Sequence, residues 1–316
     1  MNYLQTILLI IISAIAVRIS FKFDLNRYLE NRRKIKIDQL KNICPHCKIK
    51  FVDKNKAMTS VFDEGFLYGC GLFETMRSYN DNIVYFNDHL KRIQRSCKAL
   101  DMKFPYQISK LKKIIRKTVK INGFCDASVR LTLWKAAEGT NSLIIVKQYR
   151  PFPQARYVKG FNACISSFSQ NTNSFLARFK TTNYLLFQLA NREARGKGFD
   201  ETLILNNRGY LAEGSRTNIF FVKDRRLFTP ALQCGCLDGV TRRVIFDLVK
   251  KYQFDIREGN FIVQDLFDSE GVFLTNSLLG VMPLTRLEGR PIAKGFADRI
   301  TKFLMQKYNA LLKNGS

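Results

Sequence analysis

Two prolines separated by a single residue interrupt the sequence in the run YRPFPQAR at residues 149–156. Pro151 and Pro153 fix their own backbone φ angles and donate no amide hydrogen, so a helix or a central strand does not continue through this stretch. Helix-like and strand-like runs lie on both sides of it. The stretch therefore predicts a boundary between two domains, at residues 49–150 and 151–316.

The region before this boundary has the pattern of a small α+β domain. GLFETMRSY and SVRLTLWK read as strands of a small sheet. Asn87 is a favourable helix cap, and the run DHLKRIQRSCKALDM that follows it is amphipathic. We expect helices packed against a small sheet.

The region after the boundary combines strands with long helices. The run TNYLLFQLANREARGKG repeats leucine at helical spacing. Lys180 lies just before it in an uncharged setting, Glu213 ends a later strand, and residues 239–241 begin a second helix whose free amides suit an anion. Pyridoxal phosphate needs an amine, a carboxylate and a phosphate site. On spacing alone, however, surface side chains explain Lys180 and Glu213 equally well.

The first residues of the chain form an apolar run. Residues 3–21 approach the length that spans a bilayer, and a basic segment follows them. The positive-inside rule then predicts a transmembrane anchor at residues 1–21 and a membrane-anchored protein whose catalytic body lies in the cytoplasm. A cleaved signal peptide, or an apolar helix lying on the membrane or packed on the enzyme, is the alternative.

Residues 22–48 read as a basic linker that contains a CxxC motif. Cys44 and Cys47 supply half of a zinc site, and a second subunit is the one source we see for the other half. A redox pair or a turn without a ligand explains the motif as well. The eight cysteines are scattered through a long chain, which favours a reducing compartment over a disulfide framework.

The formal net charge of +26 raises the question of nucleic-acid binding. No RNA-recognition, zinc-finger or helix-turn-helix pattern is present, and the aromatic residues do not interleave with the basic clusters. We therefore expect no nucleic-acid partner. The 316 residues, 46% of them hydrophobic, are enough for two domains with large cores.

Five motifs occur in order: DEGFLYGCGLFETMRSYN, DHLKRIQRS, FKTTNYLLFQLANREARGKGFDETLILNNRGYLAEGSRTNIFFV, CGCLDGVTRR and LTNSLLGVMPL. They resemble the fold-type IV pyridoxal-phosphate enzymes, which include branched-chain aminotransferases, D-amino acid aminotransferases and 4-amino-4-deoxychorismate lyases. The resemblance covers roughly residues 50–316. It implies a two-domain α+β fold, with a small α/β domain and a larger β-rich domain, in a homodimer.

The resemblance also implies roles for individual residues. Lys180 is similar to the lysine that forms the Schiff base with the cofactor and moves the proton at Cα. Glu213 resembles the carboxylate that keeps the pyridine nitrogen protonated. The other contacts to pyridoxal 5′-phosphate are expected from Arg92, Val240, Thr241, Ser277 and Tyr184.

Other positions have less defined roles. Arg77 and Lys135 are our candidates for binding substrate carboxylates, and we expect His89 to brace the phosphate-binding arginine. Cys70 and Asp238 depart from the family pattern, which commonly has aspartate and proline there. An acid at position 238 is expected to weaken cofactor binding slightly unless it points away and caps the helix.

The motifs CGCLDG and NSLLGVMPL resemble the lyase branch most. The resemblance therefore implies an aminodeoxychorismate lyase that releases pyruvate and p-aminobenzoate, with a branched-chain or D-amino acid aminotransferase as the alternative. The substrate is then aminodeoxychorismate or an amino acid. A membrane-tethered scaffold without catalysis is a third possibility, against which the retained Lys180 and Glu213 argue.

Overall fold

The computed structural model describes residues 50–313, which have the mixed α+β fold expected from the sequence. Residues 50–59 belong to a compact unit separate from residues 60–313. They contain the short 3-10 helix η1 (Lys54–Lys56), which the side chain of Asp53 caps. All other elements described below belong to the second unit.

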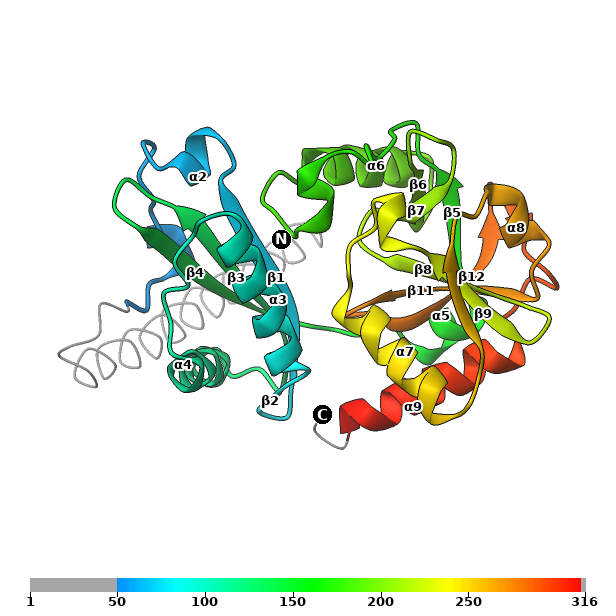
Figure 1. The fold of residues 1–316 in the computed structure, drawn as a ribbon. Helices are drawn as coiled ribbons and strands as arrows, with labels where there is room; N and C mark the ends of the chain where they lie inside the picture. The colour runs from blue at the N-terminus through cyan, green and yellow to red at the C-terminus, as the bar shows by residue number, and fades with distance from the viewer. Residues whose placement is uncertain (1–49, 314–316) are drawn as a thin grey trace, which may run out of the picture. The chain divides into compact units, whose positions relative to one another are not determined.

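The first sheet is a four-stranded sheet in the order β2-β1-β3-β4. It contains β1 (Gly71–Tyr79), β2 (Asn82–Ile83), β3 (Asp126–Lys135) and β4 (Thr140–Gln148), and all neighbours are antiparallel. Its helices are α2 (Glu64–Leu67), α3 (Phe86–Ala99) and α4 (Ile108–Ile121). Helices α3 and α4 share one apolar core with this sheet (Figure 1).

A nine-stranded sheet follows in the sequence, in the order β10-β9-β8-β11-β12-β5-β6-β7, with β13 paired to β12. Its strands are β5 (Phe161–Ile165), β6 (Glu201–Leu205), β7 (Leu211–Gly214), β8 (Asn218–Lys223), β9 (Arg226–Pro230), β10 (Ile256–Gly259), β11 (Gly271–Asn276), β12 (Gly280–Leu287) and β13 (Arg290–Pro291). Strand β5 is parallel to both of its neighbours, so the sheet is mixed.

The helices described in this second region are α5 (Gln154–Lys159), η2 (Phe175–Arg178), α6 (Leu185–Gly196), η3 (Leu232–Cys234), α7 (Val240–Lys251), α8 (Val263–Phe267) and α9 (Arg299–Lys313). Of these, α5, α6, α7 and α9 contact strands of the large sheet. Helices α7 and α9 lie together against the sheet and bury its phenylalanines Phe220 and Phe273 (Figure 1). A separate apolar cluster, which includes Leu211 and Met282, fills the other core of this region.

A backbone link joins the first sheet to the segment before α6. The amide of Phe73 donates to the carbonyl of Lys180 at 2.9 Å, and the amide of Thr182 donates to the carbonyl of Gly71 at 2.8 Å. The first residues of β1 therefore hold Lys180 in an extended conformation. The sequence alone did not predict this pairing, because the two segments lie far apart in the chain.

The described residues correct one sequence-based prediction and leave others open. No helix within residues 50–313 is long and apolar enough to cross a membrane, so the prediction of a membrane-anchored protein was wrong for this part of the chain. The anchor predicted at residues 1–21 and the linker at residues 22–48 lie outside the described residues. The two sheets lie on either side of the linker at residues 149–153, where a domain boundary stays a prediction.

Candidate active site

A cavity of about 610 Å³ lies among elements from both sheets and the segment before α6. All seven residues for which the family resemblance implies a catalytic or cofactor role contribute to its wall: Arg92, Lys180, Tyr184, Glu213, Val240, Thr241 and Ser277. Cavities of this size are typical of small-molecule sites. The residues predicted from separate motifs therefore meet in one place.

Lys180 lies on the cavity wall beside two aromatic rings. Its Nζ atom is 4.5 Å from the ring centre of Phe73 and 5.6 Å from that of Tyr184. These two rings meet edge to face, and the hydroxyl of Tyr184 donates to the carbonyl of Ser215 at 2.8 Å. The tyrosine is thereby fixed, and the lysine amine has a defined apolar support.

The amine of Lys180 is easily deprotonated. Burial lowers its pKa to about 8, and the positive charges of Arg92 and Arg130 add to this effect, while Glu74 and Glu213 oppose it. No carboxylate forms an ion pair with Lys180 within the described part of the chain. Such an amine is partly neutral near neutral pH, as a base or nucleophile requires.

Glu213 is a buried carboxylate at the end of β7. Its Oε2 atom accepts a hydrogen bond from the amide of Leu237 at 3.0 Å. Burial raises its pKa to about 7, although the Leu237 amide and Lys180 act in the opposite direction. A cationic partner in the cavity would therefore favour the ionised form of this group.

Arg92 is held on one edge by a buried acid. Its Nε and Nη2 atoms donate to the two carboxylate oxygens of Glu74 at 2.7 and 2.6 Å, and Nη1 donates to the carbonyl of Asp238 at 3.0 Å. Burial alone would raise the pKa of Glu74, but Arg92 and His89 lower it to about 2. The arginine is thus oriented before any ligand arrives.

Glu74 was not predicted from the sequence as a partner of Arg92. Alternation in β1 places Glu74 on the buried face together with Leu72 and Met76. A charged residue on the buried face of a strand needs a partner, so the alternation of β1 in the sequence could have predicted one for Glu74. His89, which we expected to brace the arginine, contacts Glu74 at 2.7 Å through Nδ1, at the carboxylate oxygen that also accepts from Arg92.

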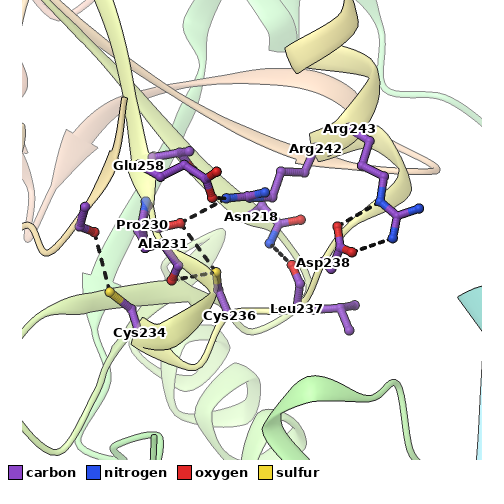
Figure 2. A network of polar contacts seen from close by, with 12 residues as sticks. Asn218, Pro230, Ala231, Cys234, Cys236, Leu237, Asp238, Arg242, Arg243 and Glu258 are labelled. Carbon is purple, nitrogen blue, oxygen red and sulfur yellow. Dashed lines mark hydrogen bonds and ion pairs between the residues drawn. The ribbon is translucent and has the colours of Figure 1, made fainter. Parts of the chain in front are cut away.

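The start of α7 forms one end of the cavity. Gly239, Val240 and Thr241 line it, and the last two are almost fully buried. A Cβ atom on Gly239 would lie 2.1 Å from the side-chain oxygen of Asn218, so no larger residue fits. Asn218 also donates to the carbonyl of Leu237 at 2.8 Å (Figure 2), which fixes the loop before the helix.

Asp238 does not contribute its side chain to the cavity wall. Arg243 donates from Nε to its carboxylate at 2.9 Å, and Arg95 donates from Nη2 at 3.1 Å. Figure 2 shows the carboxylate turned toward Arg243. Although burial opposes them, these arginines lower the pKa of Asp238. The acid is engaged outside the cavity, and Gly239 rather than Asp238 is the helix cap.

The structure does not bring the two predicted substrate-binding cations into the cavity. Arg77 forms a two-pronged ion pair with Asp126, with N–O distances of 2.9 and 2.5 Å. Lys135 lies 3.6 Å from the carboxylate of Glu64 at the exposed end of β3. Neither residue contributes to the cavity wall.

Two other arginines line the cavity instead. The Cζ atom of Arg130 lies 3.6 Å from the ring centre of Phe73, and its Nε donates to Thr132. Arg216 follows β7 and donates to Asn191. Neither forms an ion pair with a carboxylate within the described residues. The alternation of β3 could have predicted Arg130 as a cavity residue, since Arg130 and Thr132 share the face opposite the core.

No metal site is present in the described part of the chain. Residues 50–313 contain no group of three or more histidines, cysteines and acids that could hold a metal ion. Cys44 and Cys47 lie outside these residues. Cys234 and Cys236 are buried free thiols that donate to nearby oxygens (Figure 2), and Cys70 is a half-buried free thiol.

Comparison with known proteins gives consistent results. The sequence model of the family Amino-transferase class IV matches residues 71–287. A putative branched-chain-amino-acid aminotransferase of Methanocaldococcus jannaschii is 30% identical, over 82% of this chain and 93% of its own length. The aminodeoxychorismate lyase of Bacillus subtilis is also 30% identical, over 76% of this chain and 85% of its own length.

A solved structure has the same fold. A branched-chain amino acid aminotransferase from T.th., solved with pyridoxamine 5′-phosphate, matches with a TM-score of 0.78 and 27% identity. The match covers 84% of this chain and 92% of that one.

Proposed function

The chain belongs to the amino-transferase class IV family, and from this premise we propose that it is an aminodeoxychorismate lyase. The family consists of enzymes that use pyridoxal 5′-phosphate, so the non-catalytic scaffold considered from the sequence does not fit. One observation carries the proposal. The half-buried Lys180 shares a cavity with Arg130 and Arg216, which have no carboxylate partner within residues 50–313.

The cavity end near α7 fits a phosphate group. Thr275 Oγ1 is buried in the cavity wall and has no hydrogen-bond partner in the described part of the chain. Arg92 keeps free hydrogens on Nη1 and Nη2 after its bonds to Glu74 and Asp238. These donors, the amides at the start of α7 and the Ser277 hydroxyl make a set that matches phosphate oxygens.

We therefore assign the cofactor contacts as follows. Arg92, the amides of Val240 and Thr241, and the hydroxyl of Ser277 would hold the phosphate of pyridoxal 5′-phosphate. Glu213 would pair with the ring nitrogen, and that positive partner would hold the carboxylate in its ionised form. Tyr184 would contact the ring oxygen.

Lys180 carries the proton transfers. The bound cofactor withdraws electrons from the carbon that bears the substrate amino group. Because burial lowers the pKa of Lys180 to about 8, its neutral amine would take the proton from that carbon and give it to the departing enolpyruvyl group, which leaves as pyruvate. Phe73 and Tyr184 restrict where the amine travels, since its side chain packs on both rings.

The arginines favour a substrate with more than one carboxylate. Aminodeoxychorismate has a ring carboxylate and an enolpyruvyl carboxylate, and a guanidinium fork binds such groups with two hydrogen bonds. We assign Arg130 and Arg216 to them. Loss of the proton to Lys180 is then followed by cleavage of the bond to the enolpyruvyl oxygen, which yields pyruvate and p-aminobenzoate.

An aminotransferase is the second candidate. The similarity to putative branched-chain aminotransferases extends over most of the chain. A D-alanine aminotransferase of Listeria monocytogenes is also 26% identical over 81% of it. Such an enzyme would use the same Lys180, Glu213 and Arg92 and would pass the amino group to a keto acid.

The test compares the two reactions on one preparation. Purified full-length protein loaded with pyridoxal 5′-phosphate is given aminodeoxychorismate, and the release of pyruvate and p-aminobenzoate is measured. The same sample receives leucine or D-alanine with 2-oxoglutarate, and glutamate is measured. Release of both lyase products supports the proposal. Glutamate formation alone would replace the lyase proposal with the aminotransferase. Separately, light scattering of the purified protein tests the implied homodimer.

A further inference from the structure

A line of hydrogen bonds joins a buried carboxylate to the cavity. Nδ1 of His89 lies 2.7 Å from Oε2 of Glu74, and Nε2 of His89 lies 3.3 Å from the hydroxyl of Ser277. The side chains of His89 and Glu74 are each 1% exposed, so water does not replace either partner. Ser277 itself is part of the cavity wall.

The hydrogens along this line are fixed by the charge of Glu74. Burial favours the neutral form of this acid, but Arg92 outweighs it and lowers the pKa to about 2, so the carboxylate is ionised and only accepts hydrogen bonds. Nδ1 of His89 must therefore carry a hydrogen. In the neutral ring Nε2 is then an acceptor, and it takes the one hydrogen of the Ser277 hydroxyl.

A phosphate group disturbs this arrangement. Its oxygens only accept hydrogen bonds, so Ser277 must turn its hydrogen toward the phosphate to bind it. Nε2 of a neutral His89 would then face the Ser277 oxygen with no hydrogen between them, which leaves a buried acceptor unsatisfied. A proton on Nε2 restores the line, because His89 then donates to both Glu74 and Ser277 while Ser277 donates to the phosphate.

We propose that His89 takes up a proton when a phosphate group binds at Ser277, and that the resulting imidazolium holds the Ser277 hydroxyl in the donating orientation. This inference rests on the proposed function, because it takes the cofactor phosphate to bind at this end of the cavity. His89 contacts neither cofactor nor substrate. It is a positioning residue that acts through Ser277.

The charges around His89 agree with a change of state on binding. Burial lowers its pKa, and Arg92, Lys180 and the positive N-terminal end of α3 act in the same direction, while Glu74 on β1 opposes them. These groups keep the ring neutral in the absence of phosphate. A phosphate dianion at Ser277 adds negative charge in a low-dielectric setting, which favours the imidazolium.

The small number of histidines allows a direct test. The chain contains only His46 and His89, so two pairs of ring nitrogen signals are expected from full-length protein labelled with ¹⁵N-histidine, and a His46→Gln variant assigns them. Protein freed of cofactor is titrated with pyridoxamine 5′-phosphate and, separately, with pyridoxamine. Neither compound bonds covalently to Lys180, and only the first has a phosphate. Fluorescence reports binding in the same samples.

At neutral pH we expect His89 to be neutral, with its hydrogen on Nδ1, in the free protein and with pyridoxamine. With pyridoxamine 5′-phosphate bound, we expect an imidazolium. A neutral ring with this ligand bound, or an imidazolium in every state, would overturn the inference and leave the proposed function standing. If pyridoxamine 5′-phosphate does not bind, both fail.

Affinity in a His89→Gln variant gives an independent test. Loss of the imidazolium should weaken pyridoxamine 5′-phosphate about tenfold or more and leave pyridoxamine unchanged. Ser96→Ala is the matched control. It removes a buried hydroxyl from the same helix, and this hydroxyl donates to the backbone carbonyl of Arg92. Equal losses for both ligands would mean that His89 has only a structural role and would overturn the inference.

Discussion

The cavity wall holds its arginines in two opposite ways, and we call the part around Arg92 the paired end and the part around Arg130 and Arg216 the unpaired end. At the paired end, near α7, Arg92 is bound by both oxygens of the buried Glu74. At the unpaired end, Arg130 lies over Phe73 and donates to Thr132, and Arg216 donates to Asn191. Neither of these two arginines has a carboxylate partner among the described residues.

The two arrangements give the arginines different roles: one fixes the orientation of the guanidinium, and the other leaves its positive charge for a ligand. An arginine paired with a buried acid is already oriented, so it contributes geometry more than net attraction. An arginine that packs on an aromatic ring keeps its full positive charge for a ligand. The first arrangement suits a cofactor that stays in place, and the second suits a substrate that enters and leaves.

Replacing the amine between the two ends should have the largest effect. Lys180→Ala removes the base, and we expect the catalytic rate to fall about 10⁴-fold or more while both ends of the cavity stay intact. The visible absorbance of lysine-bound cofactor should disappear. Unfolding of the variant without cofactor is the control, and full activity in Lys180→Ala would remove this residue from the mechanism.

Breaking the paired end should destabilise the whole fold. Glu74→Gln leaves Arg92 buried without a compensating charge, which costs about 3–5 kcal/mol of unfolding free energy. Chemical denaturation measures this loss. Glu193→Gln is the control, because Glu193 pairs with the exposed Lys197 and its loss should change stability far less. Similar losses in the two variants would contradict the argument from burial.

The same acid should dominate the loss of stability at low pH. Its pKa is about 2 in the folded protein against an ordinary 4.5, so the stability it contributes is present above about pH 4.5 and declines as the pH falls toward 2. The full difference corresponds to about 3 kcal/mol. Between about pH 6 and pH 3, the unfolding free energy measured by chemical denaturation should therefore depend less on pH for Glu74→Gln than for the parent.

The sequence predicted several residues of the cavity wall but not the contact that orients Arg92. Lys180, Glu213, Arg92 and Ser277 were predicted because each lies in a motif that resembles the family, and all four line the cavity, while their roles stay predictions. Glu74 was not predicted, since its contact with Arg92 joins β1 to α3 and depends on how the helix packs on the strand. Local patterns do not report such contacts, although the buried face of β1 contained the clue.

The unpaired end was predicted poorly, for a related reason. Arg77 and Lys135 were chosen by charge alone, and both have acidic partners outside the cavity. The start of α3 was also displaced. The helix includes Asn87, which we expected as its cap, because the chain turns at Tyr85 with a φ of 49°.

Removing a cation from the unpaired end should affect binding without affecting the fold. We expect Arg130→Gln to raise the KM for a substrate carboxylate about 10–100-fold, with a smaller change in kcat and an unchanged melting temperature. Steady-state kinetics and thermal unfolding measure these quantities. Arg77→Gln should leave KM unchanged, because Arg77 pairs with Asp126 away from the cavity. A higher KM in both variants would point to a general charge effect.

The smallest effect is expected at Asp238. This acid tests whether its burial or its number of cationic partners determines how much a carboxylate contributes to the unfolding free energy. Like Glu74, this acid contacts more than one cation, but the side chains of Arg243 and Arg95 are 33% and 57% exposed. Asp238→Asn should cost about 0.2–1 kcal/mol, and about 1 M NaCl should remove most of the difference. Denaturation at low and high salt decides the point. A loss as large as that of Glu74→Gln would mean that burial does not separate the two acids.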